Sequence, residues 1–229
     1  MSKNLPAKLY GVGVGPGDPE LITIKAVKTL EQVDLVIAPS GSGESIAFKI
    51  ARPYIRGEVL PLEFPMTRNQ SVIESKWSEN VKKIKGYLQK GKDIAFITLG
   101  DPMIYSTYIY LLERMAGFEV VTIPGITSYS AAAARLNMPI AWGNMPFVVT
   151  PADDNETMEK ILDAFESIVL VKVSGNYDDT LSLLKVKGFK AVLVMKSGHD
   201  DEEMSFDLEK YRNKKIDYLS LIIGRKMSG

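Results

Sequence analysis

One segment constrains the fold of this chain more than any other: a strand-like run, a glycine-containing turn and a helix-like run follow one another directly. Residues 93–98 read Asp-Ile-Ala-Phe-Ile-Thr, which is typical of a buried strand, and residues 105–115 are typical of a helix. Between them, Gly100 allows the backbone to approach a ligand, Asp101 can cap the helix, and Pro102 suits its first turn. Such a turn is also what an ordinary capped helix requires.

Hydroxyl-bearing side chains follow this turn at Tyr105, Ser106 and Thr107. Small molecules bind to α/β sheets at the carboxyl ends of the strands, which is where these side chains would lie. We therefore expect them to face a ligand.

Strand-like and helix-like segments alternate along the whole chain. The expected strands are residues 8–14, 35–38, 58–62, 93–98, 118–123, 147–150, 168–173, 191–195 and 218–223. The expected helices are residues 20–32, 71–89, 105–115, 127–137, 158–165 and 178–186. This alternation predicts the α/β class, with a mostly parallel sheet and helices on both faces. Pro, Gly and Asn cluster within residues 139–151, so we expect two α/β domains, residues 1–141 and 142–229.

Two further glycine-containing turns follow the first and fifth expected strands. Residues 11–19 read Gly-Val-Gly-Val-Gly-Pro-Gly-Asp-Pro, and residues 124–128 read Pro-Gly-Ile-Thr-Ser. The first turn is not a dinucleotide fingerprint, because Pro16 stands where the third glycine is needed, and it lacks the Gly-Lys-Ser/Thr of a P-loop. In a parallel sheet all three turns would open on the same edge, which predicts a ligand cleft there.

Composition excludes several classes of function. The chain has 28 Lys and Arg against 28 Asp and Glu, so a charge-driven nucleic-acid partner is not expected. It has no cysteine, which excludes disulfides and thiolate metal sites. No apolar run approaches the ~20 residues of a membrane span, and the N-terminus lacks the apolar core of a signal peptide. These features predict a cytoplasmic protein without a membrane partner.

The three turns together resemble the motifs of the tetrapyrrole methylase family, which transfers methyl groups from S-adenosylmethionine. They resemble the family's Gly-x-Gly-x-Gly-Pro-Gly-Asp loop, its Gly-Asp-Pro loop and its Pro-Gly-Ile-Thr-Ser turn. Within the family, residues 64–68, 98–107 and 130–136 resemble the precorrin-2 C20-methyltransferase branch of corrin biosynthesis. Residues 38–45 agree, since they lack the Tyr-Asp-x-Leu-Val segment of uroporphyrinogen methylases.

The resemblance implies two α/β domains with S-adenosylmethionine between them, usually in a homodimer. The N-terminal domain would carry the tetrapyrrole cleft, and the C-terminal domain would close over the cofactor. The residues that this resemblance places at the cofactor are Pro16, Gly100, Asp101, Ile104, Thr127, Ser128, Val173 and Gly198.

The implied substrate is precorrin-2 or its cobalt-containing relative cobalt-factor II, methylated at C-20. Its carboxylates would pair with basic side chains, and arginine can pair with a carboxylate through two hydrogen bonds. The substrate-binding candidates are Arg68, Ser106, Thr107 and Arg135, followed by Arg52 and Lys172. Tyr105 is a candidate catalytic residue, although positioning alone can supply much of the rate of methyl transfer to an electron-rich ring.

Other residue patterns have simpler interpretations. His199 lies beside the acidic run of residues 200–203, which we interpret as a solvated turn rather than a metal site. Trp77 and Trp142 could stack on a macrocycle, but packing is the simpler role for each. Two alternative functions remain open: a methylase of the same fold that acts at another corrin carbon, and a non-catalytic protein that binds S-adenosylmethionine or a corrinoid. A nucleotide-dependent reductase is disfavoured by the missing fingerprint.

Overall fold

The computed structural model describes residues 6–40, 45–65 and 69–226. The chain divides into two compact units, Met1–Thr127 and Ser128–Gly229, and each is described by itself. Within the described ranges, no helix combines the length and the apolar character that a membrane crossing requires.

A five-stranded parallel sheet with the order β3-β2-β4-β1-β5 forms the first unit. Its strands are β1 (Lys8–Gly13), β2 (Leu35–Ser40), β3 (Glu58–Glu63), β4 (Ile94–Thr98) and β5 (Glu119–Ile123). Its helices are α1 (Ile24–Gln32), α2 (Ile46–Ala51), α3 (Gln70–Gln89) and α4 (Thr107–Glu113). Strand β1 lies between β4 and β5, so the carboxyl ends of these three strands are neighbours.

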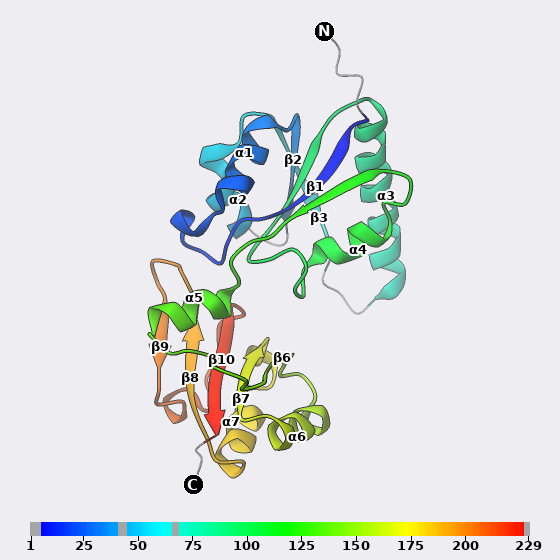
Figure 1. Cartoon of the computed structure of the whole chain (residues 1–229). Helices are drawn as coiled ribbons and strands as arrows, with labels where there is room; N and C mark the ends of the chain where they lie inside the picture. The colour runs from blue at the N-terminus through cyan, green and yellow to red at the C-terminus, as the bar shows by residue number, and fades with distance from the viewer. Residues whose placement is uncertain (1–5, 41–44, 66–68, 227–229) are drawn as a thin grey trace. The chain divides into compact units, whose positions relative to one another are not determined.

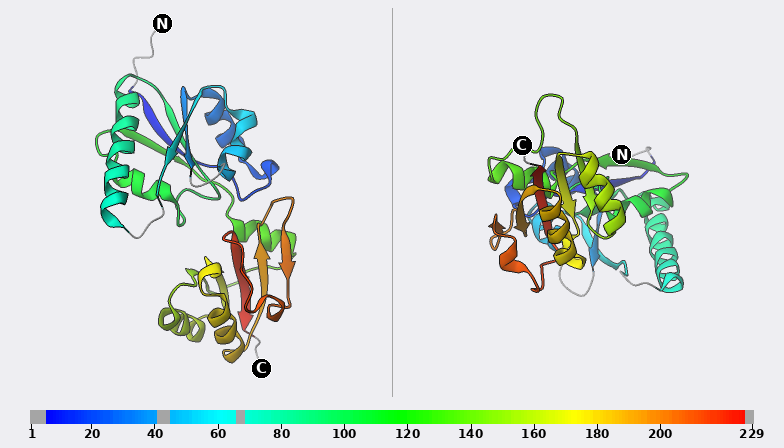
Figure 2. Two further views of the ribbon diagram at one scale, coloured as in Figure 1. Left: turned by 180° about the vertical axis from the view of Figure 1, so that it is seen from behind. Right: turned by 90° about the horizontal axis from the view of Figure 1, so that it is seen from below.

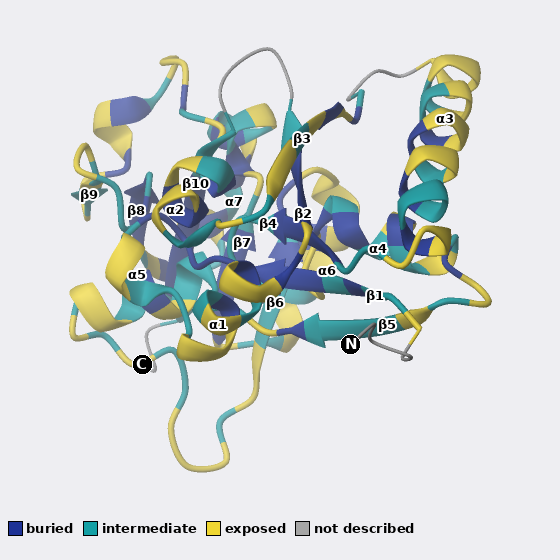
Figure 3. Ribbon diagram, turned by 90° about the horizontal axis from the view of Figure 1, so that it is seen from above, coloured by how far each residue is buried: buried dark blue, intermediate teal, exposed yellow. Residues whose placement is uncertain are grey.

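Two helical layers enclose this sheet, with α1 and α2 on one face and α3 and α4 on the other (Figure 1). Successive residues of a strand face opposite layers. Phe96 packs with Ile84 of α3, for example, while its neighbour Ala95 packs with Leu30 of α1. Figure 3 shows the result, in which the central strands are buried and the outer turns of α3 are exposed.

The second unit contains a mixed sheet with the order β6-β7-β10-β8-β9. Its strands are β6 (Phe147–Pro151), β7 (Ser167–Val171), β8 (Phe189–Met195), β9 (Glu203–Ser205) and β10 (Ser220–Lys226). Its helices are α5 (Ser128–Arg135), α6 (Asn155–Ala164) and α7 (Tyr177–Val186). Helices α6 and α7 pack on one face of the sheet and α5 packs on the other (Figure 2).

The expected α/β class is confirmed, but the second sheet differs from the prediction of a mostly parallel sheet. Only β6 and β7 pair in parallel, whereas β10 is antiparallel to both β7 and β8. Helix α7 connects β7 to β8, and β10 then enters between these two strands in the opposite direction. Two short elements, α2 and β9, were not expected from the sequence.

The boundary between the compact units lies before α5, whereas the sequence suggested a division after residue 141. Helix α5 packs with the second sheet, because Ala132 is fully buried against Val169, Val192 and Ile223. The Pro- and Gly-rich segment that suggested the boundary is therefore a connection inside the second unit.

Candidate functional site

The three glycine-containing turns of the first unit meet at one edge of its sheet, as expected. The amide of Gly100 donates to the carbonyl of Gly15 over 2.7 Å, and the amide of Val14 donates to the carbonyl of Thr98 over 3.0 Å. The amide of Gly125 donates to Oδ2 of Asp101 over 3.0 Å. We call these turns, residues 14–17, 99–106 and 124–127, the three-turn junction.

Glycines in the junction, and Gly13 directly before it, allow the backbone segments to touch. A Cβ atom at Gly13 would lie 2.6 Å from the carbonyl oxygen of Gly100, and one at Gly125 would lie 2.1 Å from the same oxygen. Gly15 and Gly100 also adopt positive φ angles of 85° and 69°, which favour glycine. These glycines serve contacts between the turns themselves, which the sequence could not distinguish from an approach to a ligand.

Gly11 has a different role inside β1. A Cβ atom there would lie 2.1 Å from Cζ of Tyr108, so the missing side chain makes room for this ring. Tyr108 is fully buried, and its hydroxyl pairs with Oγ1 of Thr122 over 2.9 Å. Burial raises the pKa of Tyr108, so the phenol remains neutral and able to donate.

Asp101 does not cap helix α4, so that part of the prediction is wrong. Its Oδ1 accepts from the amide of Met103 over 2.8 Å, while its Oδ2 accepts from Gly125 in the neighbouring turn. The helix begins at Thr107 instead of Tyr105, and its N-cap is Ser106, whose Oγ accepts from the amide of Tyr108. Asp101 therefore fastens two turns of the junction to each other.

Ser106 was expected to meet the substrate, but its side chain is engaged inside the protein. It is 7% exposed, and its Oγ also pairs with Oγ1 of Thr98 over 2.8 Å. Thr107 is partly buried at the start of α4. Pro16, expected at the cofactor, is buried in the first turn, whereas Thr127 is partly exposed at the end of the third.

The junction exposes one short run of large side chains. Met103, Ile104 and Tyr105 are 52%, 39% and 50% exposed. Tyr105 has a φ of 50°, a left-handed conformation that an aromatic residue rarely adopts. Such strain is concentrated at functional sites, so Tyr105 stays a candidate for the site.

Three of the other candidates come together in the second unit. Oγ of Ser197 donates to the carbonyl of Ser128 over 3.2 Å, and the amide of Gly198 donates to Oε2 of Glu202 over 2.6 Å. The other oxygen of Glu202 lies 3.5 Å from Nε of Arg135. Gly198 and Arg135 thus meet at one carboxylate, and Ser128 is hydrogen-bonded to Ser197, the residue before Gly198.

Glu202 was missed because an acidic run in a sequence resembles a solvated turn. Its side chain is only 9% exposed. The Nε2 atom of His199 is also shielded from solvent and has no hydrogen-bond partner within the described ranges. The expectation of a fully solvated turn is therefore wrong for these two residues. No group of three or more potential metal ligands occurs in the part of the chain that the structure describes.

The remaining candidates belong to other segments of the chain. Arg68 lies outside the described residues, Arg52 is exposed after α2, and Lys172 follows β7. Val173 is fully buried in the core of the second unit. Trp142 is 52% exposed, with the guanidinium of Arg225 4.0 Å from its ring centroid.

Comparison with known proteins agrees with this architecture. A family model described as tetrapyrrole (corrin/porphyrin) methylases matches residues 8–209. The cobalt-precorrin-2 C(20)-methyltransferase of Salmonella typhimurium is 37% identical over 196 residues, which cover 83% of each chain. A probable cobalt-precorrin-2 C(20)-methyltransferase of Methanocaldococcus jannaschii is 35% identical over 233 residues, or 96% of each chain.

Solved structures of low sequence identity share the fold. A cobalt precorrin-4 methyltransferase superposes with a TM-score of 0.75 at 23% identity, covering 95% of this chain and 94% of the other. The uroporphyrin-III C-methyl transferase of Thermus thermophilus, complexed with S-adenyl homocysteine, gives 0.70 at 18% identity, with coverage of 96% and 97%. By the family match and the two relatives, the chain belongs to the tetrapyrrole (corrin/porphyrin) methylases.

Proposed function

We propose that this protein transfers a methyl group from S-adenosylmethionine to C-20 of precorrin-2 or cobalt-factor II during cobalamin biosynthesis. The observation that carries this proposal is the similarity to two C20-methyltransferases over most of the chain, at 37% and 35% identity. A match confined to the three turns would support only membership of the family, because these turns are the motifs that define the resemblance to it.

The three-turn junction suits the methyl donor in the first unit. Its glycines and Asp101 hold three strand ends together, so the turns that carry Gly100 and Thr127 are tied to each other. The side chain of Ile104 is exposed beside them. Pro16 completes the set on the first turn, and Ser128, Val173 and Gly198 are the proposed contacts from the second unit.

When bound, S-adenosylmethionine supplies a methyl group that is already activated by its sulfonium. The contribution of this chain is to hold the acceptor carbon in line with that group, since orientation alone can supply several kcal/mol of the barrier, about 7–11 in favourable cases. We propose Tyr105 as a catalytic residue near C-20, and Arg68, Thr107 and Arg135 as substrate contacts. Ser106 would act indirectly, because as the N-cap of α4 it holds the start of this helix in position.

The proposal includes expectations about partners and location. We expect a homodimer in the cytoplasm that needs neither nucleic acid nor a membrane and holds no metal of its own, since any cobalt would arrive with the substrate. In this proposal the functional division into residues 1–141 and 142–229 follows the Pro- and Gly-rich segment, although helix α5 packs with the second sheet. Sedimentation of the purified protein with and without S-adenosylmethionine tests the dimer.

The decisive experiment is an anaerobic incubation with each tetrapyrrole and ¹³C-methyl-labelled S-adenosylmethionine. The expected product carries one labelled methyl group at C-20 by mass spectrometry and NMR. Methylation at C-1, C-11 or C-17 would contradict the position and leave the family membership intact. Tight binding of both ligands without turnover would instead support the non-catalytic alternative.

A further inference from the structure

A hollow between α3 and α4 lies beside the three-turn junction and has no role in the site described so far. It has a volume of about 330 Å³, near the lower end of the range of about 300–1,000 Å³ for ligand sites. Helix α4 contributes Thr107 and Tyr110, and its C-cap is Arg114; the spacings of three and four residues place all three on one helical face. Thr107 is also the first residue after the junction.

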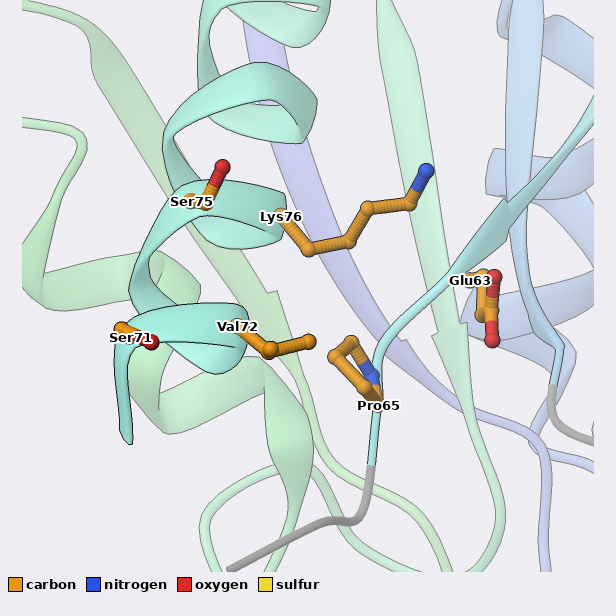
Figure 4. Close-up of a pocket in the computed structure, with 6 residues that line it drawn as sticks. All are labelled: Glu63, Pro65, Ser71, Val72, Ser75 and Lys76. Atoms are coloured by element: carbon orange, nitrogen blue, oxygen red, sulfur yellow. The ribbon is translucent and has the colours of Figure 1, made fainter. Parts of the chain in front are cut away.

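A neighbouring hollow of about 460 Å³ shares Pro65 with the α3–α4 hollow and lies against another face of α3 (Figure 4). In Figure 4, Val72 points toward Pro65, and Lys76 extends from the helix toward the side of Glu63. None of the described residues that line this second hollow is aromatic, so it offers less to a planar ligand.

The walls of the α3–α4 hollow are aromatic and fixed. Phe64 and Trp77 are 8% and 6% exposed, and their ring centroids lie 4.6 Å apart. Tyr110 packs edge-on to Trp77 with centroids 6.1 Å apart, yet remains 57% exposed. A planar ligand could therefore pack against Tyr110 without any rearrangement of the buried rings.

One cation is held in place beside these rings. Nη1 of Arg114 donates to the carbonyl of Tyr110 over 2.9 Å, and Nη2 donates to Oε2 of Glu74 over 3.2 Å. The guanidinium also lies 5.2 Å from the ring centroid of Trp77. Because these contacts already order Arg114, an anion that binds it meets a preorganised partner.

We propose that this hollow is a subsite for one carboxylate-bearing pyrrole edge of the tetrapyrrole. Arg114 receives the carboxylate and Tyr110 packs against the pyrrole. At about 330 Å³ the hollow takes one edge of the macrocycle rather than the whole ring. Without substrate, the guanidinium of Arg114 pairs with Glu74, and the substrate carboxylate competes with Glu74 for this pairing. This inference rests on the proposed tetrapyrrole substrate.

Two substitutions test the subsite because they should act in opposite directions. Arg114→Gln removes the cation and should weaken binding of cobalt-factor II about 10-fold, the effect of one lost hydrogen bond to a charged group. Glu74→Gln removes the competing carboxylate and should tighten binding about 2- to 5-fold, within the range of an exposed ion pair. The measurement is an anaerobic absorbance titration with cobalt-factor II as the probe.

Three controls separate binding from folding. Arg56→Gln removes an exposed cation that lies 3.9 Å from Glu31, and should leave the Kd for cobalt-factor II unchanged. Arg114→Lys retains the charge without the planar fork and should give an intermediate Kd. The Kd for S-adenosylmethionine should not change in any of these variants, and calorimetry reports their stability directly.

The outcomes distinguish the subsite from the proposed function. Opposite shifts for Arg114→Gln and Glu74→Gln support the subsite, even if the methyl group is found at another carbon. Unchanged affinity, or shifts in the same direction, would overturn the subsite. The proposed function would still stand in that case if the wild-type protein methylates C-20.

Discussion

Replacing Gly125 with alanine tests the central claim about the three-turn junction. The added Cβ would lie 2.1 Å from the carbonyl oxygen of Gly100 and 3.0 Å from the backbone of Gly13. Ordinary contacts begin near 3.4 Å, so the carbonyl would have to move by more than 1 Å. Both neighbours are backbone atoms, and no rotamer change can relieve the overlap.

The expected cost follows from two effects of this displacement. Overpacking costs about 1–3 kcal/mol, and loss of a hydrogen bond to a carboxylate costs about 1.5–3 kcal/mol. The hydrogen bond at risk joins the amide of Gly125 to Asp101. The two effects overlap, so we expect the free energy of unfolding to fall by roughly 3–5 kcal/mol. At about 4 °C per kcal/mol, Tm would fall by roughly 12–20 °C.

Calorimetry measures the loss of stability, and titration with S-adenosylmethionine measures the loss of affinity. The matched control is Gly86→Ala in α3, where no atom lies within 4 Å of the added Cβ. That substitution should stabilise the unit by about 0.5–1 kcal/mol, because glycine is unfavourable inside a helix. The reasoning would be refuted if Gly125→Ala kept wild-type Tm and affinity.

Three further substitutions test individual residues. Asp101→Ala should weaken S-adenosylmethionine binding about 10-fold, because it releases two turns of the junction from each other. The control Asp34→Ala removes an acceptor for the amide of Asp93 and should affect stability alone. Equal affinities for S-adenosylmethionine in these two variants would contradict the positioning role of Asp101. Tyr105→Phe should lower kcat with little change in KM if the hydroxyl acts on the reacting ring, and an unchanged kcat would remove it from the catalytic set. Arg68→Ala should raise the KM for the tetrapyrrole about 10- to 100-fold and leave that for S-adenosylmethionine unchanged, whereas equal effects on both would indicate a folding defect.

The first sheet could be predicted because local patterns and one general rule suffice. Apolar strands alternating with helices imply parallel pairing, and parallel strands end at a common edge. The second sheet could not be predicted in the same way. A strand such as β10 has the same apolar composition whether its neighbours run parallel or antiparallel to it, and its direction depends on distant packing.

The candidate site was predicted at the level of segments and less well at the level of atoms. Asp101 has the right spacing for a cap, but its Oδ2 accepts from Gly125, which is 24 positions away in the chain. Glu202 looks like part of a charged surface until the pairing with Arg135 and Gly198 is known. Partners of this kind arise from tertiary structure, which no local pattern contains.

The space left by Gly11 also limits how this sequence can change over evolutionary time. The ring of Tyr108 fills the volume that any side chain at position 11 would need. A larger residue at position 11 alone would overlap the ring of Tyr108, and a smaller residue at position 108 alone would leave a void. Either single substitution is therefore disfavoured. Positions 11 and 108 should therefore be inherited as a pair, which links the first strand to a helix encoded almost a hundred residues later.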